Sequence, residues 1–411
     1  MSKNPTGPSR KLLSGLSFKP GKKFFFFLPV ALLLAVAFYF VDFDFTGQFE
    51  GIFVLKGHRG ELVEIKDDLY LGDGRRLLFS LDFENPVFLI PRLFSHHDPD
   101  KAYLDFEWGN RAGSGFIRNM LPGGRQLLTC FGRYKDESDR YAKGLFVGGG
   151  LPKNVENENS PMINETGMAY YDGKRWYHIW CNVNEGIISS VTGDMAYPGD
   201  WEYEGGRILN QSSQSLAITT SHRVIIDGTP LHVDRRVYFK AGNTYFILSI
   251  AIRNIGNRPL TYNYVYGDEP WLGNFGSSKG NIGWIKDRTI LYTQMVDPAK
   301  YDYAGFYDYG NSIINEGHDY TRVANFLQWL ENRPKYIYYA NSPIIYELAG
   351  IIDQTEMFVP LDSNTRFIGF EWAAKSLAPG ESDHFSIAVG MAGHDPKTGF
   401  PAKPEVRRDN P

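Results

Sequence analysis

The sequence has little cysteine and lacks the short motifs that identify several common enzyme classes. Its 411 residues contain two cysteines, Cys130 and Cys181, which could form a disulfide or be two separate buried thiols. It has no Walker phosphate-binding loop, no dinucleotide-binding glycine fingerprint, no Gly-x-Ser-x-Gly elbow and no C-x-x-C pair. We therefore expect no cofactor.

Metal-binding patterns are missing as well. Residues 98–105 (DPDKAYLD) contain alternating acids but lack the glycine and the distal glutamate of a calcium loop. We interpret His96 and His97 as surface residues, and no cluster with ligand spacing accompanies His178. The sequence therefore predicts no metal site.

The first 41 residues contain no acidic side chain. Residues 1–23 carry six basic residues, and residues 24–41 (FFFFLPVALLLAVAFYFV) carry no charge. A run of this length is just enough for a helix to cross a bilayer, and the basic flank favours a cytoplasmic N-terminus. We expect a basic tail over 1–23, an uncleaved transmembrane helix over 24–41 and a linker over 42–50. The alternative is a signal peptide cleaved after the small residues at 35–37.

The rest of the chain is acidic. All 47 acidic residues but only 37 of the 43 basic ones follow residue 41, which gives a net charge of about −10. Nucleic-acid binding needs clusters of lysine and arginine, so we expect no nucleic-acid partner. The anchor predicts a bilayer partner for residues 24–41, an inner or plasma membrane location, and a main domain in the periplasm or outside the cell.

Strand signals recur from Gly51 onward, separated by turn signals. Residues 231–257 (LHVDRRVYFKAGNTYFILSIAIRNIGN) are best interpreted as two strands joined at the sequence AGN. Only residues 319–332 (DYTRVANFLQWLEN) have apolar side chains at helical spacing, with Asp319 as a candidate cap and Pro334 after the end. We expect a mainly β fold, a large antiparallel sheet domain over 51–402, and a flexible tail over 403–411. Two β domains are the alternative.

Two segments are long for loops of a compact domain. They are residues 148–165 and residues 297–320, and the second contains the tyrosine-rich stretch KYDYAGFYDYGN. Tyr303 in this stretch is a candidate glycan or protein contact, because tyrosine gives rigid amphipathic contacts at low entropic cost. The alternative is a packed lid.

Two segments resemble the galactose mutarotase-like, or aldose 1-epimerase-like, superfamily. Residues 234–273 are similar to its strand–turn–strand with an Asn-x-x-x-x-Pro-Leu turn, and residues 365–391 are similar to its final hairpin. The resemblance implies a β-supersandwich that handles carbohydrate. It also implies that Glu371, within the apolar run FIGFEWAA, is the general base.

The sequence departs from the family pattern at the histidines, one of which is the family's general acid. The family carries an Asn-His pair where this chain has TYNYVYGDEPW, which contains no histidine. His318 is the nearest candidate for the family's later histidine, the general acid, although its neighbours differ. Epimerase chemistry is therefore one hypothesis among others. An ordinary strand carboxylate is the alternative for Glu371.

Residues 266–276 (YGDEPWLGNFG) combine two carboxylates with an indole. Trp271 could stack on a sugar ring, while Asp268 and Glu269 would accept hydrogen bonds from hydroxyls. Neighbours on a strand point to opposite faces, so we expect only one of the two acids to line a cleft. A turn with solvated acids is the alternative.

The stretch KRWYHIWCNVNEG, residues 174–186, alternates sharply. We expect Trp176, His178 and Trp180 to share one strand face as a stacking strip, or to pack under a second sheet. Arg236 is a candidate hydroxyl donor from the strand face opposite Val237.

Three functions remain open. The first is a domain that binds or modifies a glycan without hydrolysis, as an epimerase-like protein or as a factor that acts on cell-envelope polysaccharide. The second is a glycoside hydrolase or lyase, in which Glu347 or Asp268 would be the second carboxylate beside Glu371. The third is a non-catalytic scaffold that contacts proteins through aromatic loops.

Overall fold

The structure, a computed structural model, describes most of the chain from residue 100 onward. The described residues are 100–111, 113–132, 142–146, 167–180, 182–269, 272–273, 281–308, 321–341, 361 and 366–407, together with the backbone of five earlier strands. Of the predicted transmembrane segment only Val41 is described. Among the described residues, no helix is long and apolar enough to span a bilayer. The membrane anchor therefore stays a prediction.

The chain divides into two compact units. The first contains residues 1–56 and 77–90. Its strands are β1 (Val41–Phe43), β2 (Ile52–Lys56) and the larger part of β5 (Arg75–Ser80), in the order β1–β2–β5. The second unit contains residues 57–76 and 91–411 and holds the three larger sheets.

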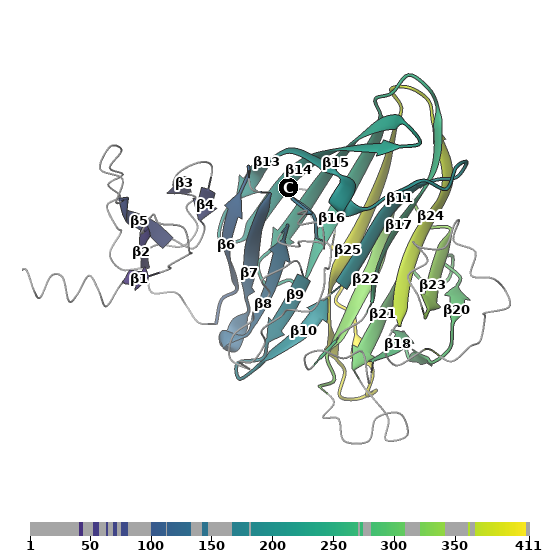
Figure 1. Cartoon of the computed structure of the whole chain (residues 1–411). Helices are drawn as coiled ribbons and strands as arrows, with labels where there is room; N and C mark the ends of the chain where they lie inside the picture. The colour runs from purple at the N-terminus through teal and green to yellow at the C-terminus, as the bar shows by residue number, and fades with distance from the viewer. Residues whose placement is uncertain are drawn as a thin grey trace, which may run out of the picture. The chain divides into compact units, whose positions relative to one another are not determined.

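The second unit is built from antiparallel sheets (Figure 1). A seven-stranded sheet has the order β10–β9–β8–β7–β6–β4–β3. Its strands are β3 (Val63–Glu64), β4 (Leu69–Leu71), β6 (Tyr103–Gly109), β7 (Ser114–Met120), β8 (Gln126–Phe131), β9 (Gly167–Tyr171) and β10 (Trp176–Trp180). Two short 3-10 turns, Pro122–Gly124 and Pro198–Asp200, are the described helical elements.

A six-stranded sheet and a ten-stranded sheet complete the unit. The six-stranded order is β12 (Met195–Ala196), β11 (Asn182–Ser189), β17 (Leu260–Glu269), β24 (Phe367–Leu377), β23 (Tyr336–Ala340) and β20 (Gln294–Val296). The ten-stranded order is β13 (Glu202–Gln211), β14 (Ser215–Ile226), β15 (Thr229–Lys240), β16 (Tyr245–Asn254), β25 (Ser382–His394), β22 (Ala324–Glu331), β21 (Tyr303–Asp308), β18 (Asn281–Ile285) and β19 (Arg288–Ile290), with β26 (Pro401–Ala402) paired to β25. The expected mainly β fold of antiparallel sheets is confirmed.

One apolar core lies between these sheets. It includes Phe106 from the seven-stranded sheet, Phe370 from the six-stranded sheet, and Leu248 and Ile387 from the ten-stranded sheet. Along β15 buried and partly exposed residues alternate, because successive side chains of a strand point to opposite faces. The ten-stranded sheet therefore has a core face and an outer face, and the outer face carries polar side chains along β14 to β16.

The predicted hairpin at residues 231–257 is confirmed. β15 and β16 pair from Leu231 opposite Asn254 to Phe239 opposite Phe246. Gly242 in the turn has φ of +85°, a conformation that glycine adopts without a steric penalty, and its N–H donates to the side chain of Asn119.

The predicted helix over 319–332 is wrong, because residues 324–331 form strand β22. β22 lies between β21 and β25, and its first five side chains are buried, from both faces of the strand. Leu327 packs in the main core, while Phe326 packs in a second apolar cluster on the outer face. A strand that is buried on both sides has apolar residues at positions that also fit a helical period.

The tyrosine-rich stretch is also more ordered than expected. Residues 303–308 form β21 within the ten-stranded sheet. Residues 309–320, the later part of the predicted loop 297–320, lie outside the described residues, as does all of the predicted loop 148–165. Residues 403–407, within the expected tail, lie against the outer face of the ten-stranded sheet. There Lys403 donates to Gln328, and the N–H of Arg407 donates to the hydroxyl of Tyr245.

Candidate functional site

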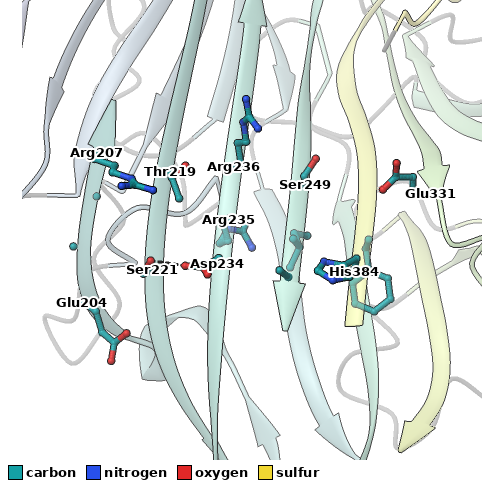
Figure 2. Close-up of a pocket in the computed structure, with 15 residues that line it drawn as sticks. Glu204, Arg207, Thr219, Ser221, Asp234, Arg235, Arg236, Ser249, Glu331 and His384 are labelled. Carbon is teal, nitrogen blue, oxygen red and sulfur yellow. Dashed lines mark hydrogen bonds between the residues drawn. The ribbon is translucent and has the colours of Figure 1, made fainter. Parts of the chain in front are cut away.

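The outer face of the ten-stranded sheet carries a polar groove. Its volume is about 540 Å³, and β13, β14, β15, β16 and β25 supply its walls and floor, with Glu331 of β22 at one end. Figure 2 shows charged and hydroxyl side chains projecting from these neighbouring strands. Because five hydrogen-bonded strands position these groups, their spacing is fixed by the sheet itself.

The strand register places one set of side chains in a straight line across the sheet. Arg207 is opposite Thr219, Thr219 is opposite Arg236, and Arg236 is opposite Ser249. Ser249 is in turn opposite Ser386, and their hydroxyls are 3.3 Å apart. We call Arg207, Thr219 and Arg236 the arginine row. Figure 2 shows the first four of these residues at one level of the groove.

The acids of the groove lie beside this line and are already engaged. Asp234 accepts a hydrogen bond of 2.5 Å from Ser221, and its Oδ1 lies 3.1 Å from Nε2 of His232. The other ring nitrogen of His232 lies 2.9 Å from Oε2 of Glu204. His232 therefore bridges two carboxylates.

The two arginines of the arginine row, unlike the acids of the groove, have no partners among the described residues. Among the described residues, neither the guanidinium of Arg207 nor that of Arg236 has a hydrogen bond or an ion pair, although Arg207 is exposed and Arg236 is partly buried. Guanidinium offers five N–H donors. The groove therefore presents unused donors beside acids that already have partners.

Arg235, next in sequence, points the other way. It is 2% exposed and forms an ion pair with Glu185 of β11 inside the protein. The hydroxyl of Tyr264 donates to the same carboxylate at 2.7 Å. Burial raises the pKa of the Glu185 carboxyl, and the Arg235 charge and the Tyr264 hydrogen bond oppose that shift. This pair supports the floor of the groove from below.

Glu371 lies on β24, away from the groove. Its side chain is 1% exposed, and one carboxylate oxygen accepts a hydrogen bond of 2.7 Å from Asn263. The other oxygen is buried and has no hydrogen bond among the described residues. Burial raises the pKa of Glu371, while Asn263 and the charge of Lys335 act in the opposite direction. The described surroundings of this carboxylate are thus an amide and an ammonium group.

Several predicted site residues fall outside what the structure describes. Trp271, His318 and Glu347 are not among the described residues, and the side chains of Asp268 and Glu269 are not described either. The backbone of Asp268 lies next to the last residue of β17, opposite Val183 and Ile368. The roles of all five stay predictions.

The expectation that Trp176, His178 and Trp180 share one strand face is wrong. Strand β10 has a register shift between His178 and Trp180. Trp180 therefore packs in the main core and donates to the carbonyl of Gly390 at 2.9 Å, whereas Trp176 packs on a separate cluster with Cys130. A bulge reverses the alternation of side chains, which a count by twos along the sequence misses.

His178 and Tyr303 lie apart from the groove. The backbone of His178 exchanges two hydrogen bonds with Gly273, and burial lowers the pKa of its ring to about 4. Tyr303 is buried on β21 against Trp284, and its hydroxyl accepts a hydrogen bond from the N–H of Lys286. Cys130 is buried and Cys181 lies outside the described residues, so the disulfide stays a prediction.

Of the predicted residues, Arg236 lines the groove. Four residues in or beside the groove are not among those predicted from the sequence: Glu204, Arg207, His232 and Asp234. One signal was available, since His232, Asp234 and Arg236 occur at alternate positions of HVDRRVYF. Among the described residues, no group of three or more histidine, cysteine or acidic side chains is arranged to hold a metal ion.

Comparisons with known proteins give weak structural similarities. The sequence matches no family model and no curated protein. A Klebsiella pneumoniae structure named as an aldose 1-epimerase is 11% identical over 74% of this chain and 86% of its own, with a TM-score of 0.37. A galactose mutarotase-like protein from Clostridium acetobutylicum is 8% identical over 71% of this chain and 98% of its own, with a TM-score of 0.33.

A third similar structure is longer than this chain. It is an alpha-galactosidase of family GH36 from Geobacillus stearothermophilus, 9% identical over 74% of this chain and 42% of its own, with a TM-score of 0.32. The first two structures carry the names of the superfamily that residues 234–273 and 365–391 resemble.

Proposed function

We propose that this chain is a carbohydrate-binding protein and that the groove on the outer face of the ten-stranded sheet holds a glycan. The groove itself is the observation that carries the proposal: hydroxyl, guanidinium, imidazole and carboxylate groups converge from five adjacent strands. A sugar presents several hydroxyls, and each must find a partner when it leaves water. The resemblance of residues 234–273 and 365–391 to a carbohydrate-handling superfamily supports the same conclusion.

The groove suits an extended ligand bound through hydrogen bonds. Phe385 is the one aromatic residue among its lining residues, and the backbone atoms around it belong to rigid strands. Because the strands fix the backbone of these donors and acceptors before the ligand arrives, little backbone ordering entropy is lost on binding. A chain of sugar units that crosses the strands would meet side chains from each strand in turn.

We place this activity at a membrane surface. The apolar run over residues 24–41 and the basic residues before it would anchor the chain with its N-terminus in the cytoplasm. The β domain would then lie in the periplasm or outside the cell, where cell-envelope polysaccharide is the available ligand. Fractionation of cells that express the full chain, with protease added from outside, tests this topology.

A glycan array probed with the full chain in detergent tests the binding. Ala251 lines the groove from β16, so Ala251→Trp should fill it and abolish binding. Ile225 is 61% exposed on β14 and does not line the groove, so Ile225→Trp is the matched control and should bind as the wild type does. If the wild type binds no glycan, or if Ala251→Trp binds unchanged, the proposal fails.

Chemistry at Glu371 is a second candidate. A buried carboxylate with a raised pKa, one of whose oxygens has no hydrogen bond among the described residues, can act as the general base that the family resemblance implies. Glu371→Gln should then leave glycan binding intact and remove any turnover of the bound glycan. Unchanged turnover in Glu371→Gln would exclude Glu371 from the chemistry. If the wild type binds a glycan but does not turn it over, catalysis at Glu371 is excluded and the carbohydrate-binding function stands.

A further inference from the structure

We propose that the ligand of the groove is an acidic glycan whose negative groups bind the arginine row. This inference rests on the proposed carbohydrate-binding function and specifies its ligand. The observation behind it is the pairing of charges in the groove. Arg207 and Arg236 have no partner among the described residues, while Asp234 and Glu204 are both held by His232.

Arg236 has the stronger need for a counter-ion. It is partly buried on the outer face, between Thr219 of β14 and Ser249 of β16. Removing a charge from water costs free energy unless an opposite charge or hydrogen bonds replace the lost solvent. The carboxylate of Asp234, two residues earlier on the same face, makes no ion pair with Arg236 and is engaged by Ser221 and His232. A bound anion would supply the missing partner.

The chemistry of the row favours oxyanions in particular. Both cations are arginines, and the planar guanidinium fork donates two parallel hydrogen bonds to a carboxylate, sulfate or phosphate. The hydroxyl of Thr219 lies between them in register and can donate to the same ligand. A neutral sugar would leave most of these donors unused.

The spacing of the two arginines indicates a polymer. Arg207 and Arg236 are two strands apart in the same register line, and neighbouring strands are about 4.8 Å apart, so their Cα atoms are separated by roughly 10 Å. Two acidic groups on nearby sugars of one chain match a separation of this size, and each can pair with one guanidinium group. The row therefore suits an acidic polysaccharide.

The attraction is local, because the chain as a whole has a net charge of −4. A protein that bound polyanions by overall charge would be basic. Here two cations are placed within an acidic molecule, so long-range repulsion opposes nucleic acid and the row must act at short range. Binding should therefore depend on the chemistry of the glycan as well as on its charge.

Isothermal titration of the full chain with oligogalacturonate tests the inference, with a neutral glucan oligomer of equal length as the comparison. We expect tighter binding of oligogalacturonate and a loss of about tenfold for Arg207→Gln or Arg236→Gln, since each removes charge-assisted hydrogen bonds. Arg236→Lys should recover part of the loss, because it keeps the charge without the fork. Arg253→Gln is the control, because Arg253 is exposed on β16 and does not line the groove.

The outcomes separate this inference from the function on which it rests. If neutral and acidic oligomers bind equally and Ala251→Trp blocks both, the groove binds glycans and the acidic preference is wrong. If neither oligomer binds and the glycan array is also negative, both proposals fail. If single-stranded DNA of equal charge competes as well as oligogalacturonate, the row is a general polyanion site and the inference is overturned.

Discussion

Arg235 and Glu185 form an ion pair inside the protein that joins the ten-stranded sheet to the six-stranded sheet. Their side chains are 2% and 0% exposed, and Tyr264 completes the cluster through its hydrogen bond to Glu185. Arg236, the next residue, faces the groove with no described partner. Arg235 thus forms a buried ion pair while Arg236 faces the groove, since successive side chains of a strand point to opposite faces.

The first prediction concerns this pair. Arg235→Met should lower the free energy of unfolding by about 3–5 kcal/mol, because it leaves the Glu185 carboxylate buried without its cation. Adding Glu185→Leu should recover much of the loss. Urea unfolding of the full chain measures both. Arg236→Met is the neighbouring control and should change the stability by no more than about 0.5 kcal/mol. Equal losses in the two arginine variants would contradict the assignment.

The second prediction concerns His222, whose side chain is fully buried. Burial lowers the pKa of its ring to about 4, so between pH 6.5 and 4 the unfolded chain binds the proton more tightly than the folded chain. The contribution of neutral His222 to the free energy of unfolding is therefore fully present above pH 6.5. About 3 kcal/mol of it should be lost as the pH falls to 4.

His222→Gln removes that dependence and can still donate to the carbonyl of Lys143, which lies 2.8 Å from the ring. The free energy of unfolding, measured from pH 4 to 7, should fall less steeply toward acid in the variant than in the wild type. Parallel curves would show that His222 does not carry the effect.

The third prediction concerns Glu371 and has the opposite sign. Its pKa is raised by burial, so the folded chain holds the proton more tightly than the unfolded chain does. This contribution is present below the ordinary value of 4.5 and is lost as the pH rises through the raised pKa. Glu371→Gln keeps a carbonyl to accept from Asn263. Its stability relative to the wild type should therefore increase as the pH rises above 4.5, and a constant difference would refute the shift.

The fourth prediction concerns Gly369 on β24. A Cβ atom at this position would lie 2.3 Å from the ring of Tyr338, which stacks on Phe367. Gly369→Ala should destabilise the chain by about 1–3 kcal/mol, because the ring must move in a packed region. Gly393 on β25 is the control, since a Cβ atom there would meet only the carbonyl oxygen of Ala402, at 3.7 Å. Thermal unfolding of both variants measures the difference.

The parts of the fold that the sequence predicts are those with local signals. The hairpin of β15 and β16 follows from alternation on both sides of AGN, where Gly242 supplies the positive φ that the turn requires. Strand β22 could not be separated from a helix, because Phe326 and Leu327 are buried on opposite faces and the run is short. Its pairing with β21 and β25, which are distant from one another in the sequence, shows that it is a strand.

The groove depends on how strands that are distant in the sequence pair with one another. This pairing and its register cannot be predicted from a single sequence. Arg207 and Arg236 become neighbours only through the register of β13, β14 and β15. β13 also shifts register twice, at Tyr203/Gly205 and at Ile208/Asn210. A count by twos from Glu204 along β13 reaches Gly206 and misses Arg207. The alternation along β15 was readable, and it is what identified Arg236.

The two register shifts of β13 have a consequence for how copies of this chain behave toward one another. β13 is the outermost strand at one end of the ten-stranded sheet as described, and it is ten residues long. A long, regular outer strand offers unpaired N–H and C=O groups to a second molecule, which is how sheets grow into fibrils. The register shifts interrupt that pattern at two places, so the edge beside the groove can stay open to solvent without favouring strand-by-strand aggregation.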